Sequence, residues 1–144
     1  MSAVSYSISR DFTFAASHVL DTLPVTHKCS RMHGHNYIVR VELETAQLDD
    51  NGFVMDYGEL TRIVQPLISE LDHRHLNDLM NGLPATAEHL ARQLLDSIAR
   101  TLHDKLGCKG PHFGDPHVRS LRDHGWALSV GVSETPKTWA WCRA

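Results

Sequence analysis

Two N-terminal segments of the chain alternate apolar and polar residues. The even positions of residues 4–18 carry the apolar side chains and end at His18, and the odd positions of residues 33–44 do the same in the second segment. Alternation is typical of strands with one buried face, because successive side chains point to opposite sides. The polar, turn-rich stretch 21–32 predicts a loop between two long strands.

Helical spacing replaces alternation in the middle of the chain. Apolar residues recur every three or four positions between residues 60 and 71, behind a capping-box pattern formed by Asp56 and Glu59. Pro66 lies inside this pattern and should kink the helix or displace its start. A second helix is expected to open at Thr86 and to run to about residue 106.

Alternation returns near the C-terminus. Residues 126–132 read as a strand whose buried parity continues to Glu134, and residues 139–142 read as a short last strand. The predicted elements follow the order strand, strand, helix, helix, strand, strand. This order predicts an α+β domain with an antiparallel four-stranded sheet and two helices on one face. Four strands leave two open edges, which favours a homo-oligomer.

Composition narrows the class of protein. The chain has 144 residues, a net charge of −3 and no basic arm or long apolar run, so neither nucleic acid nor a membrane is expected as a partner. We expect one domain over residues 1–144, with a surface excursion at about 107–125. Three widely spaced cysteines favour a reduced, cytoplasmic protein. The eleven histidines favour metal binding or acid–base chemistry, because imidazole is a common metal ligand with a pKa near neutrality.

The histidines at the strand ends predict a metal site. His33 and His35 are two residues apart and leave the same face of a strand, and His18 ends the other strand on its buried parity. Three imidazoles with one open position are typical of catalytic zinc. A surface turn entering a strand would explain His33 and His35 alone equally well. Cys29 could be a fourth ligand, a reactive thiolate beside the metal, or a buried inert thiol.

Two further groups are candidates for chemistry. Asp72 could hold His73 as a proton shuttle, although a solvated helix end explains these neighbours as well. Glu134 is either a surface residue at a strand end or an acceptor for the N–H groups of a ligand. Thr86 and Glu88 are explained by capping and by the helix dipole.

Six motifs in order resemble the 6-pyruvoyltetrahydropterin synthase superfamily over most of the chain. They are FTFAASH, CSRMHGH, GFVMDYGEL, LDHRHLND, TAEHLA and VSETP. The three residues between Cys29 and His33 resemble the bacterial 6-carboxy-5,6,7,8-tetrahydropterin synthase branch. A longer excursion at 107–125, and Ala87 in place of a hydroxyl residue, depart from the compact bacterial pattern.

The resemblance implies the tunnelling fold, with sheets of several subunits joined into a barrel in a trimer-based, tetrameric or hexameric assembly. It implies Zn²⁺ on His18, His33 and His35, catalysis by Cys29, Asp72 and His73, and substrate binding by Glu134 with the Thr86 segment. The implied reaction converts 7,8-dihydroneopterin triphosphate and water to 6-carboxytetrahydropterin, acetaldehyde and triphosphate.

Three alternatives stay open at this point. The same site could serve a 6-pyruvoyltetrahydropterin synthase or a dihydroneopterin-cleaving lyase, or the chain could be a zinc- or pterin-binding module without turnover. Lys28 and Arg31 are plausible contacts of the triphosphate. The pathway that uses the product, queuosine or another deazapurine, is not fixed by the residues.

Overall fold

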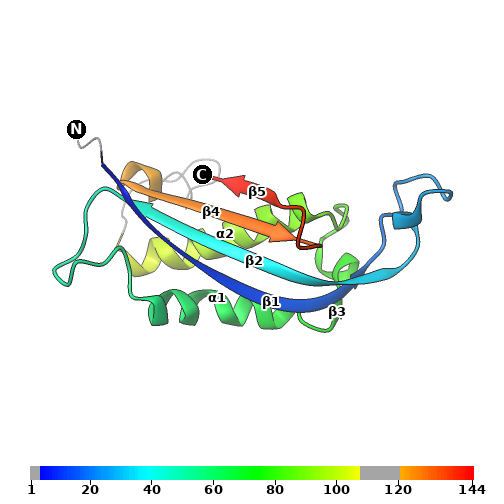
Figure 1. The fold of residues 1–144 in the computed structure, drawn as a ribbon, viewed down its shortest axis with the longest axis horizontal. Helices are drawn as coiled ribbons and strands as arrows, with labels where there is room; N and C mark the ends of the chain where they lie inside the picture. Colours follow the sequence, from blue (N-terminus) through cyan, green and yellow to red (C-terminus); the bar gives the residue numbers. More distant parts are fainter. Residues whose placement is uncertain (1–3, 108–120) are drawn as a thin grey trace.

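The computed structural model describes residues 4–107 and 121–144. Five strands form one sheet, and two long helices cover one of its faces (Figure 1). The strands are β1 (Tyr6–His18), β2 (His33–Thr45), β3 (Arg74–His75), β4 (Trp126–Ser133) and β5 (Ala140–Arg143). The helices are α1 (Tyr57–Leu71) and α2 (Ala87–Lys105), with 3-10 turns η1 (Lys28–Ser30) and η2 (Leu76–Leu79).

The sheet differs from the expected four antiparallel strands. Its order is β3-β1-β2-β4-β5, and β3 runs parallel to β1 while the other pairs are antiparallel. β3 has two residues, which is too short to leave any alternation in the sequence. It forms because the segment after α1 is hydrogen-bonded to β1, beginning with His73 N–H to the Ala15 carbonyl at 2.6 Å. Within one chain the sheet is open and does not close into a barrel.

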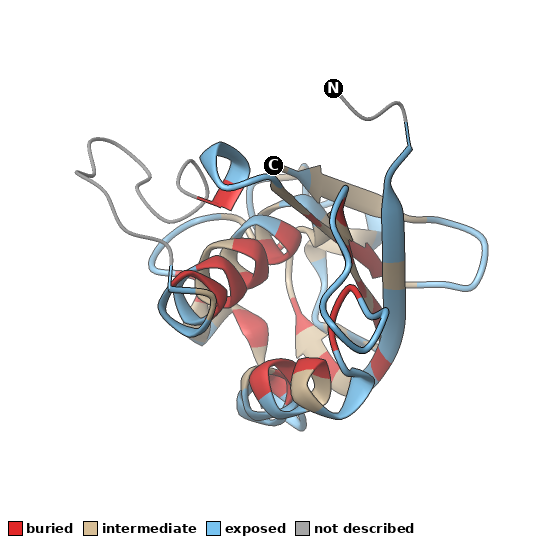
Figure 2. Ribbon diagram, turned by 90° about the vertical axis from the view of Figure 1, so that its left-hand side faces the viewer, coloured by how far each residue is buried: buried red, intermediate tan, exposed pale blue. Residues whose placement is uncertain are grey.

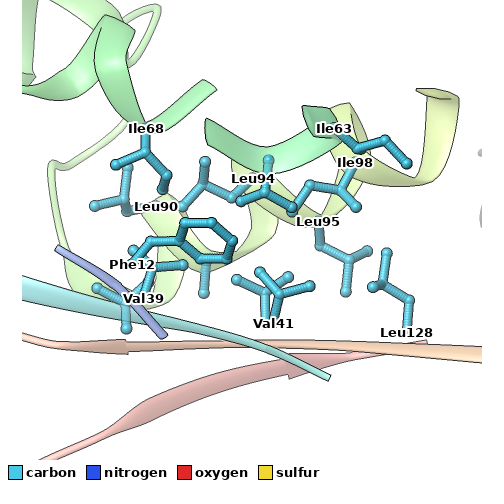
Figure 3. Close-up of a cluster of buried hydrophobic side chains, with 14 of the residues drawn as sticks. Phe12, Val39, Val41, Ile63, Ile68, Leu90, Leu94, Leu95, Ile98 and Leu128 are labelled. Atoms are coloured by element: carbon cyan, nitrogen blue, oxygen red, sulfur yellow. The ribbon is translucent and has the colours of Figure 1, made fainter. Parts of the chain in front are cut away.

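The core lies between the sheet and the two helices. Figure 2 shows the buried sides of α1 and α2 turned toward the sheet, and Figure 3 shows Phe12, Val39 and Val41 of the sheet facing side chains of both helices. Burying each large aliphatic or aromatic side chain stabilises the fold by about 1.5–3 kcal/mol. The face of the sheet toward the helices is the inner face from here on, and the opposite one is the outer face.

Alternation predicted the inner face of β1 correctly only along its second half. Phe12, Phe14, Ala16 and His18 are buried, whereas Val4 and Tyr6 are 58% and 46% exposed. The prediction of burial was therefore wrong for Val4 and Tyr6. Alternation identifies which side chains share a face, but another element must cover that face to bury it.

Both helices begin where the sequence predicted. Asp56 Oδ2 accepts from Glu59 N–H at 3.1 Å, and Thr86 Oγ1 accepts from His89 N–H at 3.2 Å. α1 starts directly after Asp56 and continues through Pro66, so the proline does not displace the start of the helix.

The outer face is polar and aromatic at the β5 edge. Trp139 and Trp141 stack with ring centroids 5.9 Å apart, Arg40 lies over Trp139 and Arg143 over Trp141. Gly131 makes room for this arrangement, since an added Cβ would lie 2.8 Å from the Trp141 ring.

The surface excursion expected at about 107–125 falls mostly outside the described residues. Most of the excursion at 107–125, together with Cys108, lies in residues 108–120, which are not described. Across the described part of the chain, no helix combines the length and apolar character needed to cross a membrane.

Candidate functional site

Three imidazoles meet at the end of the sheet, as the sequence predicted. The register pairs His18 with His33 and Ala16 with His35, so all three side chains leave the inner face within two residues of one another. His18 Nε2 lies 2.9 Å from His33 Nε2 and 3.2 Å from His35 Nε2. His18 is fully buried, and the other two are half-buried.

The hydrogen bonds of the His18 and His33 rings leave their Nε2 atoms free to bind a metal. His18 Nδ1 lies 2.7 Å from the Ala85 carbonyl, and His33 Nδ1 lies 2.7 Å from the Arg31 carbonyl. A carbonyl only accepts, so each Nδ1 carries the hydrogen and each Nε2 presents a lone pair. Lone pairs this close repel unless a cation lies between them. Carbonyl partners of this kind also orient metal-bound histidines.

The spacing of the nitrogens fits a small cation. Tetrahedral zinc with Zn–N bonds of about 2.0–2.1 Å separates its nitrogen ligands by about 3.3 Å. In the described parts of the chain, the group of side chains able to share a metal is His18, His33 and His35. Neither Cys29 nor Glu134 belongs to this group, so the geometry does not support Cys29 as a fourth ligand.

Glu134 lies beside the three-histidine cluster. It follows β4 on the inner-face parity, and its Oε2 is 3.8 Å from His35 Nε2. Burial lowers the pKa of His35, and the Glu134 carboxylate opposes that shift. Glu134 therefore places a partly exposed acceptor next to the candidate metal centre.

Tyr37 forms the floor of the cluster. Its ring stacks on Phe14 at 4.7 Å and meets the edges of the His18 and His35 rings. Its hydroxyl is buried and has no hydrogen-bond partner among the described residues. Burial raises the pKa of Tyr37 well above its ordinary value, and the Glu134 charge adds to the shift. The sequence indicated Tyr37 only as an apolar core position, and alternation gives no sign of an unpaired hydroxyl.

Cys29 lies in η1, within the loop that joins β1 to β2. Its N–H donates to His27 Nδ1 at 3.1 Å, and its carbonyl accepts from Leu20 N–H at 3.0 Å. The loop joins the end of β1 to the start of β2 (Figure 1), and these two strand ends carry His18 and His33. The thiol is half-buried, which excludes a fully buried inert cysteine.

Asp72 and His73 do reach each other, although adjacent side chains often cannot. His73 takes a left-handed backbone conformation with φ of 59°, and its Nδ1 lies 3.0 Å from Asp72 Oδ1. The same oxygen accepts from Ala15 N–H at 3.0 Å. This backbone hydrogen bond, with a smaller contribution from His73, lowers the pKa of Asp72. The pair is thus an ionised carboxylate holding an exposed imidazole.

A groove of about 490 Å³, called the β3 groove below, adjoins this pair. It is lined by Ala15, Ala16, Ser17, Gly34, His35, Asn36, His73, Arg74 and His75. Ala15 and Ser17 alternate with the buried Ala16 and His18, so the floor of the groove belongs to the outer face of the sheet. Sequence reasoning missed Ser17 and His75, which are 58 residues apart and meet at 2.9 Å between Ser17 Oγ and His75 Nδ1.

Thr86 serves as the N-cap of α2, and its neighbour Ala85 accepts from His18. The start of α2 therefore adjoins the histidine cluster. The capping role of Thr86 is confirmed, and contact with a substrate stays a prediction.

The fold and the site together define an α+β domain with a candidate three-histidine metal centre at one end of its sheet. The chain belongs to the 6-pyruvoyl tetrahydropterin synthase family, whose model matches residues 7–144.

Several relatives carry a more specific name. A probable 6-carboxy-5,6,7,8-tetrahydropterin synthase of Halobacterium salinarum is 53% identical over 123 residues, covering 76% of this chain and 69% of the relative. The 6-carboxy-5,6,7,8-tetrahydropterin synthase of Synechocystis is 35% identical over 110 residues, covering 73% and 80%. The fold matches the 6-pyruvoyl tetrahydropterin synthase of Caenorhabditis elegans with a TM-score of 0.72 at 22% identity, covering 98% of this chain and 96% of that one.

Proposed function

We propose that the protein is a zinc-dependent carbon–carbon lyase that converts 7,8-dihydroneopterin triphosphate and water to 6-carboxy-5,6,7,8-tetrahydropterin, acetaldehyde and triphosphate. The observation that carries the proposal is the convergence of three Nε2 atoms beside the Glu134 carboxylate. Support for this branch of the family comes from the relatives named 6-carboxytetrahydropterin synthases and from the interval between Cys29 and His33. The reaction would take place in the cytoplasm and supply a deazapurine precursor such as that of queuosine.

His18, His33 and His35 would hold the zinc. A bound zinc ion would act as a Lewis acid toward the side-chain hydroxyls of the substrate. The protein fixes the His18 and His33 rings through the Ala85 and Arg31 carbonyls, so these ligands are oriented before the metal arrives.

Glu134 would anchor the pterin ring. A carboxylate has two acceptor oxygens, which match the 2-amino group and the neighbouring ring N–H as a bidentate, charge-assisted pair. Its position 3.8 Å from His35 would keep the ring beside the metal ligands and present the side chain of the substrate to the metal. The Thr86 segment adjoins the same space through Ala85.

Cys29 and His73 would move protons at the carbons next to the ring. The Cys29 loop is tied to the cluster at both ends, and Asp72 holds the Nδ1 of His73 as a donor so that Nε2 is free to exchange a proton. The Asp72–His73 pair adjoins the outer face, whereas the three histidines occupy the inner face. A homo-oligomer would let the pair of one subunit meet the metal centre of another.

Measuring metal content and turnover on the purified protein tests the proposal. We expect about one zinc per chain, and acetaldehyde with a carboxylated pterin from dihydroneopterin triphosphate. His18→Ala should remove both the metal and the activity, and His124→Ala, a change at an exposed histidine outside the cluster, should keep both. Zinc that stays bound after His18→Ala would contradict the site.

Product analysis separates the alternatives. A product that keeps its three-carbon side chain would indicate a 6-pyruvoyltetrahydropterin synthase, and loss of the side chain without a carboxyl group would indicate a dihydroneopterin-cleaving lyase. For a non-catalytic module, the wild type would bind zinc and pterin without turnover, and Cys29→Ala would change neither affinity. For the proposed enzyme, Cys29→Ala should keep its zinc and lose turnover.

A further inference from the structure

The β3 groove has a wall that is fixed to β1 by an unusual number of contacts. Asp72 Oδ1 accepts from Ala15 N–H, and Ser17 Oγ bonds to His75 Nδ1 at 2.9 Å. The Asn77 side chain accepts from Val19 N–H at 2.9 Å and donates to the Val19 carbonyl at 2.8 Å. The segment 72–77, which carries the lining residues His73, Arg74 and His75, is therefore held against β1 before any ligand binds.

The groove presents hydrogen-bond donors and positive charge. Its lining contains the Arg74 guanidinium and the imidazoles of His73 and His75, and no carboxylate; the ring of the remaining lining histidine, His35, belongs to the inner face. Arg74 is exposed and forms no ion pair within the described residues, so its five N–H donors are available. Asp72 lies just behind the wall, but its Oδ1 already accepts from Ala15 and contacts His73.

The Ser17–His75 contact supplies a donor in either tautomer. If the Ser17 hydroxyl donates to Nδ1, His75 carries its hydrogen on Nε2; if Nδ1 donates, the Ser17 hydroxyl hydrogen is free. Gly34 has no side chain to fill the floor of the groove. A volume of about 490 Å³ is within the usual range for a small-molecule site, about 300–1,000 Å³.

We propose that the β3 groove of one subunit binds the triphosphate group of a substrate held at the metal centre of a neighbouring subunit, with Arg74 as its main contact and the Ser17–His75 pair as a second donor. A polyphosphate needs several converging donors without a nearby free carboxylate, and planar guanidinium groups bind phosphate oxygens in a bidentate manner. The inference rests on the proposed function for the identity of the anion. It names residues of the groove in place of Lys28 and Arg31, which the sequence left as plausible contacts.

Titration of the purified protein with inorganic triphosphate tests this site without turnover. We expect Arg74→Ala to weaken triphosphate binding at least about tenfold, and Ser17→Ala to weaken it about threefold. Arg122→Ala removes an exposed arginine outside the groove and should leave the affinity unchanged. Inorganic phosphate should bind more weakly than triphosphate, and added salt should weaken both.

Zinc content is measured before and after each titration, because triphosphate also chelates zinc. Equal affinities of Arg74→Ala and Arg122→Ala would overturn the inference, as would a loss that occurs instead in Lys28→Ala or Arg31→Ala. Triphosphate binding that depends on Arg74 in a protein without lyase turnover would keep the inference and overturn the proposed reaction. If the enzyme turns over and Arg74→Ala binds triphosphate as tightly as wild type, the inference is wrong and the proposed reaction stands.

Discussion

At the residue scale, His73 shows how local backbone geometry builds the candidate acid–base pair with Asp72. A non-glycine residue in the left-handed region costs about 1–2 kcal/mol, and here the cost accompanies a 3.0 Å contact between His73 and Asp72. The hydrogen bonds of Ala15 to both residues hold that conformation in place. Strain of this kind concentrates at functional sites, which agrees with the proposed acid–base role.

Asp72→Asn should change how stability depends on pH. The pKa of Asp72 is lowered from its ordinary value of 3.8, mainly by the Ala15 N–H. A group with a lowered folded-state pKa stabilises the fold above its unfolded-state pKa, and this contribution disappears as the pH falls through the folded value. Wild type should therefore lose more thermal stability than Asp72→Asn between pH 5 and pH 2, measured by circular dichroism. Parallel curves for the two proteins would contradict the role of the Ala15 hydrogen bond.

Tyr37→Phe tests the unpaired hydroxyl below the histidine cluster. Removing a buried hydroxyl that lacks a partner should leave the free energy of unfolding unchanged or raise it by up to about 1 kcal/mol. Tyr57→Phe makes the same change at a side chain that is 54% exposed, and should stay within about 0.5 kcal/mol of wild type. Urea unfolding measures both variants. A loss of about 1 kcal/mol or more in Tyr37→Phe would show that the hydroxyl is paired in solution.

At the element scale, the start of α2 links helix capping to the candidate site. Thr86 caps the helix, and the carbonyl of the residue before it orients His18. Any shift of this helix end would therefore move a ring of the candidate metal centre. The counterpart at α1 is the Asp56 cap, whose helix starts directly after it.

Thr86→Ala should lower the free energy of unfolding by about 1 kcal/mol through loss of the cap. It should also weaken binding of zinc or pterin, because Ala85 and His18 depend on this turn. Asp56→Ala is the matched control, since it removes the cap of α1 and should lower stability by a similar amount without changing either affinity. Equal effects of the two variants on ligand binding would show that the Thr86 cap does not support the candidate site.

At the scale of the whole molecule, the sheet formed by the described residues has two unpaired edges. One edge is the two-residue β3, and the other is the four-residue β5. The three histidines of the candidate metal centre face the helices, whereas the β3 groove lies on the outer face beside His73. A single chain thus keeps two parts of the proposed reaction on different faces of one sheet.

We expect a homo-oligomer, so light scattering should give a mass several times the 16.2 kDa of one chain. If subunits share active sites, co-expressed His35→Ala and His73→Ala chains should show turnover that neither variant has alone. In such a mixture some sites combine an intact metal centre with an intact His73 from a neighbour. A monomer with full activity would overturn both the oligomer and the sharing of sites.

Tertiary structure alone decided several features of the site. β3 leaves no sequence pattern because it has two residues and exists through hydrogen bonds to β1. The Ser17–His75 contact joins residues from distant segments, and the unpaired Tyr37 hydroxyl depends on everything packed around it. Exposure of Val4 and Tyr6 likewise depends on which elements cover the strand.

The sequence by itself determined the long strands, both helices with their caps, and the shared face of His33 and His35. These features follow from periodicity and local hydrogen bonding. Both depend on residues a few positions apart, so the sequence alone is enough to predict them. Contacts across the sheet depend instead on strand order and register, which local patterns leave open. The sequence therefore placed His33 and His35 on one face and His18 at the end of a strand, and the tertiary structure decided, through the register of β1 and β2, that the three meet and what surrounds them.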